Sequence, residues 1–440
     1  MSGRTPSGML ISADWILPIA TGPIHNGAVR VVGDSVADVG TLVELAAAYP
    51  EDTREHFAGC MITPGLVNAH THLTLTALSG VVPPLPFVQW LPRLVAALKP
   101  WEIADHEASG VLGAEESLAC GVTVVGDIAY GAAEVASASA AGLGGVYYWE
   151  LLGMRAEDIK SALDALRFPE DPATYGTRVV CGLSPHSPYT AGPGLLTAVS
   201  EHARTLGVPT AVHLDESAAE LQLLMDGTGP LSATAARTAL GFTPPGSTPV
   251  EYLASLGALQ GTTAIHLCHV TAREITLLAE QARGVVTCPR SNRYLDNPPP
   301  AIAPLLDAGL AVGIGTDSSA SNHDLDLMAE LRAVRDSERT LSAVTLLNMV
   351  TAGGARAIGV ERHYGSLAPG KFADLVIHRV AASSEPEAAL IDHAGRSTTE
   401  AVMSGGVWRV LSGDLLTRDS AAARRAADAR VHSLEVLNAT

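Results

Sequence analysis

The sequence predicts an α/β protein: a (β/α)8 TIM barrel with a small β-sandwich domain built from both ends of the chain. In the middle of the chain, eight short apolar runs alternate with Ala/Leu-rich stretches of helical spacing. The runs are apolar throughout, as expected of parallel strands that are buried on both faces. The two ends carry shorter strand-like pieces interrupted by Gly and Asp. We therefore assign residues 61–360 to the barrel, residues 1–60 to the N-terminal half of the β-domain, and residues 361–440 to its C-terminal half plus a terminal helix.

The eight expected barrel strands mostly begin after Gly or Pro and end in polar residues. They are residues 61–71, 121–128, 145–151, 178–184, 208–214, 262–268, 284–288 and 310–316. Crossover helices are expected between them, among others at 156–167, 194–206 and 272–282. Thr271 is a good N-cap for the last of these helices, because Glu274 follows three residues later as in a capping box. The long connection 217–261 is expected to carry several short helices.

Four pieces near the chain ends are expected to be strands of the β-domain: residues 8–16, 27–32, 373–377 and 401–411. The alternative that these pieces only decorate the barrel stays open. Residues 418–430 are rich in Ala and Arg, a composition that favours a helix on the surface.

The composition argues against several classes of function. With 28 Lys and Arg against 46 Asp and Glu, the net charge of −18 opposes binding to nucleic acid or to an anionic membrane. The five cysteines are scattered and include no Cys-x-x-Cys pair, which favours a reducing compartment over a disulfide framework. The first ten residues hold no long apolar segment, and no run reaches the roughly 18 apolar residues of a membrane span. We expect a cytoplasmic globular protein.

Histidine and aspartate side chains recur where the expected strands end. His70 and His72 stand two residues apart on one strand, so both point to the same face. His213, His266 and Asp317 lie at the ends of the fifth, sixth and eighth strands. The carboxyl ends of the strands in such a barrel meet on the face where active sites are built. Imidazole and carboxylate groups gathered there predict a site for a divalent metal ion.

These residues stand in motifs that resemble the amidohydrolase superfamily. Within it, the chain resembles the mononuclear-metal aminohydrolase branch of adenosine-type, S-adenosylhomocysteine, aminodeoxyfutalosine and triazine deaminases. The motifs are Pro-Gly-Leu-Val-Asn-Ala-His-Thr-His at residues 64–72, His-Leu-Asp-Glu-Ser at 213–217 and Gly-Thr-Asp-Ser at 315–318. The resemblance extends from about residue 8 to about residue 411 and includes Gly-Ser-Leu-Ala-Pro-Gly-Lys-Phe-Ala-Asp-Leu at 365–375.

The resemblance implies a single divalent metal ion, zinc or alternatively iron. The four ligands that it implies are His70, His72, His213 and Asp317. It also implies three catalytic roles. Glu216 would carry a proton from the attacking water to the substrate ring, His266 would hold that water, and Asp317 would use its second carboxylate oxygen to orient the water or to receive its proton. The chain has only three lysines, none at the end of an expected barrel strand, which excludes a binuclear centre bridged by a carboxylated lysine.

Four further side chains are candidates for binding the substrate: His186, Glu150, Trp90 and Arg290. His186 lies in Pro-His-Ser-Pro-Tyr-Thr, a segment whose imidazole faces the substrate in this branch; a loop histidine bonded to the backbone is the alternative. Arg290, with Arg293 nearby, could hold a substrate carboxylate or be a solvated charge. Glu150 could read a base edge or pair with Arg155, and Trp90 could cover an aromatic base or only pack.

The sequence therefore predicts a metal-dependent hydrolytic deaminase of an aminated heteroaromatic ring. The favoured substrate is an adenine-nucleoside derivative such as aminodeoxyfutalosine, whose benzoate would give an arginine at the rim a carboxylate to bind. Triazine chlorohydrolase, guanine deaminase and pterin deaminase are alternatives with the same metal chemistry. A catalytically inactive barrel that serves as a scaffold is the alternative outside enzymes. The expected partner is a small molecule, and a homodimer is left open.

Overall fold

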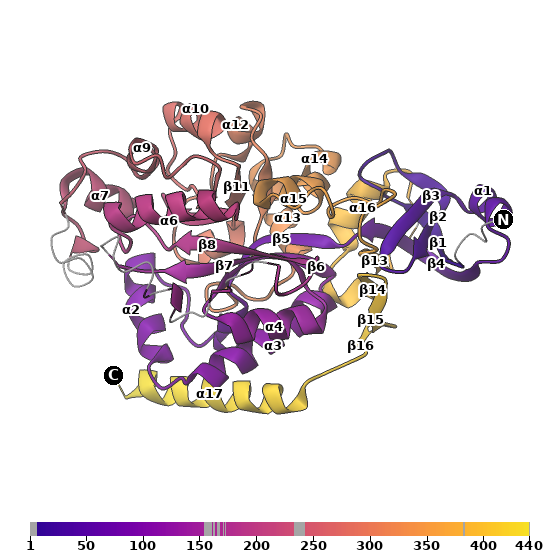
Figure 1. Ribbon diagram of the computed structural model, residues 1–440, viewed down its shortest axis with the longest axis horizontal. Coiled ribbons are helices and arrows are strands. Elements are labelled where there is room, and N and C mark those ends of the chain that lie inside the picture. Colours follow the sequence, from indigo (N-terminus) through magenta and orange to yellow (C-terminus); the bar gives the residue numbers. More distant parts are fainter. Residues whose placement is uncertain are drawn as a thin grey trace.

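The protein, seen here in a computed structural model, contains a parallel barrel and a separate mixed sheet (Figure 1). The structure describes residues 7–153, 161, 163–164, 168–169, 171, 173–232, 243–381 and 383–439. The barrel strands are hydrogen-bonded in chain order, each parallel to the next. They are β5 (Leu66–Thr71), β6 (Val122–Ala129), β7 (Gly144–Leu151), β8 (Val179–Pro185), β9 (Thr210–Leu214), β10 (Thr262–His266), β11 (Gly284–Thr287) and β12 (Val312–Ile314).

The first and last of these strands meet and close the barrel. Thr71 forms a parallel bridge with Asp317, whose amide donates to the carbonyl of His70 over 3.1 Å. The side chain of Asn68 donates to the Thr316 hydroxyl over 2.8 Å and accepts from the Thr316 amide over 3.0 Å. The predicted barrel is thereby confirmed.

Helices surround the barrel (Figure 1). Those described are η1 (Leu73–Leu78), α2 (Phe87–Leu98), α3 (Ile103–Ala119), α4 (Ala132–Ala141), α6 (Pro193–Leu206), α7 (Ala218–Asp226), α9 (Pro249–Ser255), α10 (Ala272–Gln281), α11 (Pro289–Tyr294), α12 (Ile302–Asp307), α13 (Leu327–Ser337), α14 (Ala343–Met349), α15 (Ala352–Ile358) and α16 (Pro386–His393). Helix α10 begins at the predicted capping box, because the Thr271 hydroxyl accepts from the Glu274 amide and the Glu274 carboxylate accepts from the Thr271 amide. The helix expected at 156–167 lies outside the described residues, apart from 161, 163 and 164.

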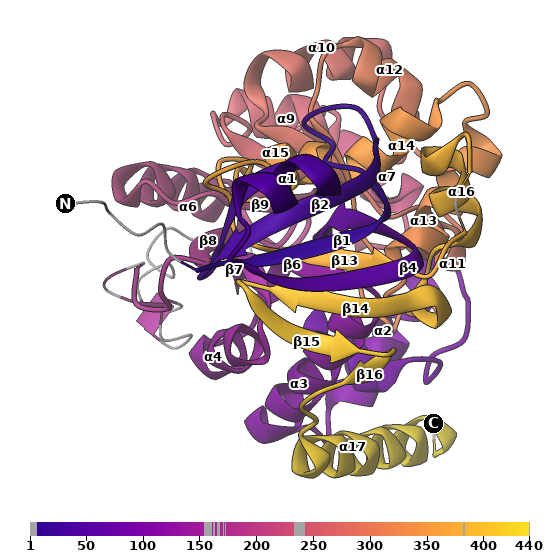
Figure 2. The ribbon, with the colours of Figure 1, turned by 90° about the vertical axis from the view of Figure 1, so that its right-hand side faces the viewer.

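The two chain ends form one eight-stranded mixed sheet, in the order β16-β15-β14-β13-β4-β1-β2-β3 (Figure 2). Its strands are β1 (Met9–Ile16), β2 (Ile24–Val32), β3 (Ser35–Thr41), β4 (Thr53–Pro64), β13 (Leu375–His378), β14 (Thr399–Ser404), β15 (Val407–Leu411) and β16 (Asp414–Leu415), with the short helix α1 (Leu42–Ala48) after β3 and the 3-10 turn η2 (Arg396–Thr398) before β14. Strand β4, from the N-terminal part of the chain, pairs with β13 from the C-terminal part. The β-domain built from both chain ends is thereby confirmed.

Two expected strands are each divided in the structure. The run 61–71 is not one barrel strand: Met61–Pro64 ends β4 in the β-domain, and β5 begins after Gly65. A Cβ at Gly65 would lie 2.0 Å from the Thr123 hydroxyl, so only glycine allows the chain to cross there. The run 401–411 is a hairpin of β14 and β15, because Gly405 and Gly406 have φ of +58° and +74° and form a two-residue turn.

An ion pair joins the β-domain to the barrel. Arg178 donates from both terminal nitrogens to the carboxylate of Asp374, over 2.8 and 3.0 Å. The guanidinium also lies 4.9 Å above the ring of Phe372. The paired hydrogen bonds to Asp374 and the cation–π contact with Phe372 are both directional, so they fix the orientation of the β-domain on the barrel.

The C-terminal helix α17 (Ser420–Asn438) is longer than the helix expected at 418–430 and lies along the barrel beside α2 and α3 (Figures 1 and 2). Trp101 donates from Nε1 to the Ser433 hydroxyl over 2.8 Å, and Ser433 donates to the carbonyl of Ala97 over 2.8 Å. These bonds hold α17 against the end of α2. Among the described residues, no helix has the length and apolar character that crossing a membrane requires.

Candidate metal centre and substrate cavity

Four side chains predicted as metal ligands meet at the carboxyl ends of the barrel strands. Nε2 of His72 and Nε2 of His213 are 3.3 Å apart, and Asp317 Oδ1 lies 3.5 Å from His70 Nε2 and 3.6 Å from His72 Nε2. All four residues are at least nine-tenths buried. Nitrogen ligands 2.0–2.1 Å from a tetrahedral ion are about 3.3–3.4 Å from each other, so the spacing of these atoms suits a single cation.

Neighbouring residues fix the direction in which several of these side chains point. Nδ1 of His213 donates to the carbonyl of His186 over 2.9 Å, which leaves its Nε2 free to bind a metal. Asp317 Oδ2 accepts from the hydroxyls of Ser291 at 2.6 Å and Ser321 at 2.9 Å. The second oxygen of Asp317, expected to orient water, is thus held by two serines, and Oδ1 is the oxygen that faces the imidazoles.

The backbone turns abruptly where the site residues leave their strands. Asp215, His266 and Asp317 have φ of +53°, +78° and +56°, in the left-handed region that non-glycine residues seldom adopt. Such conformations cost about 1–3 kcal/mol each and persist where the surrounding structure imposes them. Here they occur at or beside three predicted site residues, and they set the direction in which each side chain enters the cavity.

The protonation states of His72, His213 and Asp317 suit a cation. Burial, with the neighbouring His70, lowers the pKa of His72 to about 3, and burial holds the pKa of His213 well below its usual value. Burial alone would raise the pKa of Asp317, but His70 and His72 outweigh it and hold that pKa well below its usual range. Neutral imidazoles beside an ionised carboxylate are the states that metal ligands require.

Unpaired polar atoms are a second sign of a ligand at this place. Both ring nitrogens of His70 and Nδ1 of His72 are buried and lack a hydrogen-bond partner among the described residues. Buried nitrogen atoms of this kind are costly unless something pairs with them. Ligand atoms of His70, His72 and His213 lie within 4.8 Å of one another, and the Asp317 carboxylate lies beside two of these imidazoles. Divalent transition metals bind imidazole and carboxylate groups, so the residues fit the metal that the sequence predicted.

The two predicted proton-handling residues lie together beside this centre. Glu216 Oε1 is 3.9 Å from Nε2 of His266, and both residues line the same cavity. Nδ1 of His266 donates to the Asn292 side-chain oxygen over 3.0 Å, so Nε2 faces the cavity without a proton. Burial, together with the charges of Asp317 and Glu220, raises the pKa of Glu216 well above its usual value. A carboxylate whose pKa is raised is a stronger base, so it accepts a proton readily.

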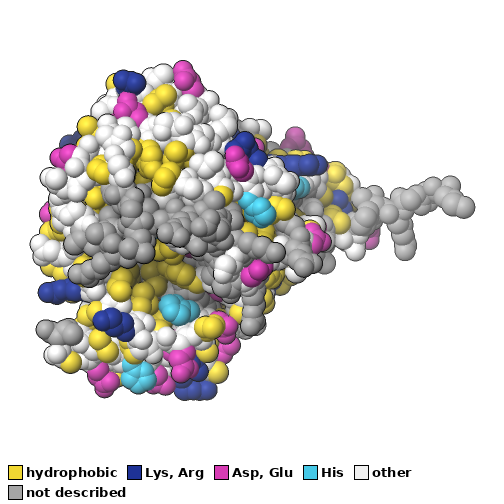
Figure 3. All heavy atoms as spheres, turned by 60° about the vertical axis from the view of Figure 1, so that its left-hand side comes forward, with side chains coloured by type: hydrophobic (Ala, Val, Ile, Leu, Met, Phe, Trp, Pro, Cys, Tyr) yellow, Lys and Arg dark blue, Asp and Glu magenta, His cyan; other side chains and the backbone are white. Residues whose placement is uncertain are grey.

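The cavity has a volume of about 700 Å³ and a mainly apolar wall. Figure 3 looks towards the side of the molecule that carries α2 and shows hydrophobic side chains gathered in a hollow. Trp90, which extends from α2, lies in this wall. His186 and Glu150 also line the cavity, with Nε2 and Oε1 4.0 Å apart. Burial raises the pKa of Glu150 to about 8, so its carboxyl group is mostly protonated at neutral pH and can donate a hydrogen bond.

The structure does not bring the two arginines of the rim into this cavity. Arg290 donates to the carboxylate of Asp324 over 2.7 and 3.2 Å and lies 3.6 Å from Glu330. Arg293 is exposed on α11, and neither arginine is among the residues that line the cavity. Asp324, the carboxylate partner of Arg290, lies 34 residues further along the chain, so no local sequence pattern predicts this ion pair.

Several residues of the site were not assigned a role from the sequence. Tyr130 lines the cavity directly after β6, and Ser291 and Asn292 lie in α11, four and five residues after the end of β11, so the rule that strand ends converge would have found all three. Lys99, at the end of α2, also lines the cavity. Helix α2 lies in the connection between β5 and β6, and the rule about strand ends does not apply to such a helix.

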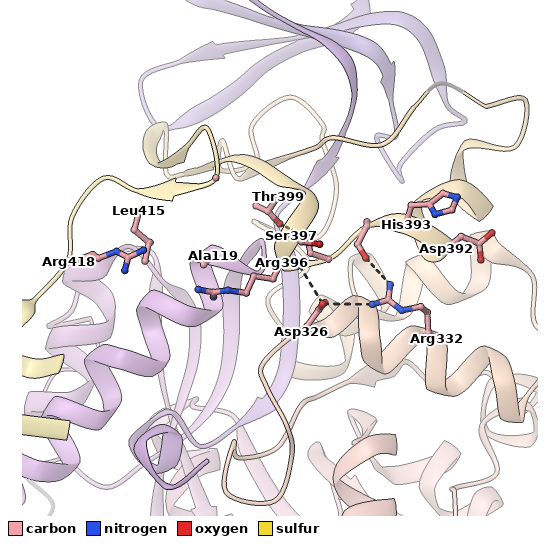
Figure 4. Close-up of a pocket in the computed structure, with 13 residues that line it drawn as sticks. Ala119, Asp326, Arg332, Asp392, His393, Arg396, Ser397, Thr399, Leu415 and Arg418 are labelled. Atoms are coloured by element: carbon pink, nitrogen blue, oxygen red, sulfur yellow. Dashed lines mark hydrogen bonds and ion pairs between the residues drawn. The ribbon is translucent and has the colours of Figure 1, made fainter. Parts of the chain in front are cut away.

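A second cavity, of about 510 Å³, lies between the barrel and the β-domain. Figure 4 shows Asp326 bonded both to Arg332 and to the backbone of Arg396. Arg332 also donates to the carbonyl of Ala394 over 2.8 Å. The cavity contains polar side chains but none of the predicted metal ligands.

Comparison with known proteins places the chain in a family. The Amidohydrolase family profile matches residues 61–409. The chain is 31% identical to a 5-methylthioadenosine/S-adenosylhomocysteine deaminase of Moorella thermoacetica over 428 residues, 94% of this chain and 96% of that protein. It is 35% identical to an aminodeoxyfutalosine deaminase of Deinococcus radiodurans over 377 residues, 80% of this chain and 85% of that protein.

A solved structure agrees over the whole fold. A crystal structure of an adenosine deaminase from Xanthomonas campestris with bound zinc is similar with a TM-score of 0.84 and 27% identity, covering 98% of this chain and 99% of that one. The match of the family profile, the similarity to curated relatives over most of their length and the metal-binding geometry at the strand ends lead to one conclusion. The chain belongs to the amidohydrolase family, and it is a hydrolase that acts on carbon–nitrogen bonds.

Proposed function

We propose that the protein is a metal-dependent hydrolytic deaminase that converts the amino group of an adenine-nucleoside derivative to a carbonyl group and releases ammonia. The observation that carries the proposal is that Glu216 and His266, 3.9 Å apart, face one cavity with the four side chains of the metal centre. The relatives named for deamination of 5-methylthioadenosine, S-adenosylhomocysteine and aminodeoxyfutalosine support an adenine nucleoside as the substrate class.

The residues of the chain divide the reaction between them. A divalent cation held by the four side chains would lower the pKa of a bound water and so supply a nucleophile near neutral pH. Glu216 accepts the proton of the attacking water and passes it to the ring nitrogen next to the carbon under attack. His266 holds the water through its unprotonated Nε2. The hydroxyl group now on the ring carbon then gives up its proton to the exocyclic amine, which leaves as ammonia, and the ring regains its conjugation as a carbonyl.

The buried rim residues orient the substrate. Glu150, mostly protonated at neutral pH, donates a hydrogen bond to the substrate, while His186 accepts through Nε2. The Nδ1 atom of His186 lies 2.6 Å from the Thr190 hydroxyl and 3.0 Å from the Ser187 hydroxyl, which fixes the orientation of the ring. An imidazole held in this way presents the same edge to each substrate molecule.

We propose zinc as the metal. Three nitrogen donors and one carboxylate oxygen suit this ion, and the Xanthomonas structure contains it. Elemental analysis of the purified protein tests this proposal: about one zinc per chain is expected, and iron in its place would contradict it. None of the five cysteines, all of them buried, forms a disulfide, which supports a reducing, cytoplasmic location.

The decisive experiment measures ammonia release from adenosine, 5′-methylthioadenosine, S-adenosylhomocysteine and aminodeoxyfutalosine, with guanine and a chlorotriazine beside them. At least one adenine nucleoside should release ammonia. The variant Glu216→Gln should keep the metal and lose about 10²- to 10⁴-fold in kcat, because only the proton acceptor is removed. The exposed Glu201→Gln on α6 serves as the control and should keep full activity. Release of chloride from the triazine, without ammonia from any nucleoside, would contradict the proposal.

A further inference from the structure

The wall of the substrate cavity beyond the metal centre is formed largely by one helix. Helix α2 contributes apolar side chains to it, and Leu75, Leu152, Tyr189 and Leu295 contribute from other elements. Val95 and Leu152 remain about half exposed, at 54% and 52%, although both are large and apolar. Apolar side chains left exposed at the mouth of a cavity are typical of a surface that a ligand covers.

Leu91 and Val95 of α2 and Lys99, which caps the C-terminal end of this helix, form a row along this wall. They are four residues apart, so they lie on one face of the helix, with about 12 Å along the helix between the first and the last. The row therefore runs from two apolar side chains to an ammonium group. Lys99 is the one lysine or arginine among the described residues that line the cavity. Arg290, which could have supplied a positive charge, is bound to Asp324.

We propose that Lys99 is a specificity-determining residue that binds an anionic group at the end of an apolar substituent on the nucleoside. This inference rests on the proposed function. With the amino-bearing ring beside Glu216 and His266 and the sugar beside Glu150 and His186, a substituent on the 5′ carbon extends along Leu91 and Val95. A carboxylate at its far end reaches Lys99. The substrate class is thus an adenine nucleoside whose 5′ substituent is an apolar spacer that ends in a carboxylate.

The relatives include enzymes named for substrates of two kinds. Aminodeoxyfutalosine carries a benzoate and S-adenosylhomocysteine carries an amino-acid group, both of which end in a carboxylate, whereas 5-methylthioadenosine carries a short uncharged thioether. The row on α2 distinguishes these two kinds by chemistry, because only a substituent that ends in a carboxylate has a negative charge to place beside Lys99. An uncharged substituent contacts Leu91 and Val95 but forms no ion pair with Lys99.

A lysine at this position also has a role that involves no substrate. Lys99 is the residue that ends α2, where a positive charge interacts favourably with the carbonyl end of the helix dipole. That role affects the stability of the protein, but it does not change the preference of the enzyme for charged over uncharged substrates. The ratio of two kcat/KM values therefore separates the two roles, whereas activity on one substrate does not.

The experiment compares aminodeoxyfutalosine with its methyl ester, which keeps the ring and removes the charge. The metal-loaded wild-type enzyme should show a kcat/KM about fivefold higher for the acid, the upper range for a solvent-accessible ion pair. Lys99→Met should bring the ratio of the two kcat/KM values close to one, and Lys99→Glu should invert it. Arg93→Met is the matched control, because Arg93 is an exposed cation of the same helix that does not line the cavity. It should keep the wild-type ratio.

Each outcome of this experiment either supports or overturns the proposed role of Lys99. An unchanged ratio in Lys99→Met, even if its melting temperature falls, would overturn the proposal and leave only the role at the helix end. A wild-type enzyme that deaminates adenosine and 5′-methylthioadenosine but neither the acid nor the ester would overturn it as well, while the proposed function stands. Ammonia from none of these nucleosides would instead refute the proposed function, and this inference with it.

Discussion

The cavity at the strand ends and the cavity between the two domains both contain carboxylates and basic side chains, but the polar atoms of the two cavities differ in their partners. In the cavity between the domains, Asp326 Oδ1 accepts from the amides of Met328 and Ala329, and its Oδ2 lies near Arg332 and the amide of Arg396. In the cavity at the strand ends, Nδ1 of His72 and Oε1 of Glu150 have no hydrogen-bond partner among the described residues. Behind this cavity, His70 has two unpaired nitrogens.

This difference indicates what each cavity does. A buried polar group without a partner costs about 1–3 kcal/mol, so a folded protein keeps several of them together only where a ligand supplies the missing partners. Paired groups such as Asp326 instead contribute to holding the parts of the protein together. The predictions below test whether the strand-end cavity serves chemistry while the domain-interface cavity serves stability.

The largest effect is expected at the metal centre. Asp317→Ala should reduce both the bound metal and ammonia release to background, because it removes the single carboxylate among the four proposed ligands. Metal analysis and the ammonia assay measure the two losses on the same preparation. Far-UV circular dichroism should remain that of the wild type. A variant that kept its metal would show that Asp317 is not a ligand.

A smaller effect is expected from the residues that hold this aspartate. Ser291→Ala removes the hydroxyl that donates to Asp317 Oδ2 over 2.6 Å, while Ser321 still donates. Loss of one such supporting bond should weaken metal binding about 10- to 100-fold. Competition with a chelator measures the affinity. Ser200→Ala on α6, where the hydroxyl is buried but distant from the centre in the fold, is the control. Equal affinity in both variants would count against the serine pair.

The smallest effect on catalysis is expected in the cavity between the domains. Asp326→Ala removes the N-cap of α13 and should lower the free energy of unfolding by about 0.5–2 kcal/mol. Because Asp326 lines the other cavity, kcat/KM should stay within about twofold of the wild-type value. Urea unfolding and the ammonia assay give the two quantities. A large loss of activity without a loss of stability would break the distinction between the two cavities.

Much of the fold and the centre of the site could be predicted because both follow from local patterns. Apolar runs locate strands, and the carboxyl ends of parallel strands meet on one face, so His213, His266 and Asp317 could be brought together without coordinates. The two divided strands depended on glycines whose need appears only in three dimensions. Gly65 is required by Thr123, which lies 58 residues away in the sequence.

The surroundings of the site were harder to predict, because they depend on partners that are distant in the sequence. Arg290 is an arginine beside a strand end, and only the fold shows that Asp324 neutralises it. Likewise, the second oxygen of Asp317 is occupied by Ser291, from the preceding strand end. Lys99 enters the cavity because α2 packs where it does, and that packing includes α17 from the far end of the chain. Sequence patterns give the chemistry of the centre, and the fold decides which groups surround it.

The closure of the barrel at Asp317 has a mechanical consequence. The amide of this residue is bonded to the first strand while its carboxylate faces the imidazoles of that strand, so the seam of the cylinder and the candidate ligand shell share one residue. A bound ion would therefore link β5 to Asp317, which follows β12, across the seam. Extracting it with a chelator should therefore loosen the cylinder along β5 and β12 first, and hydrogen exchange of their amides should speed up before that of the distant β-domain.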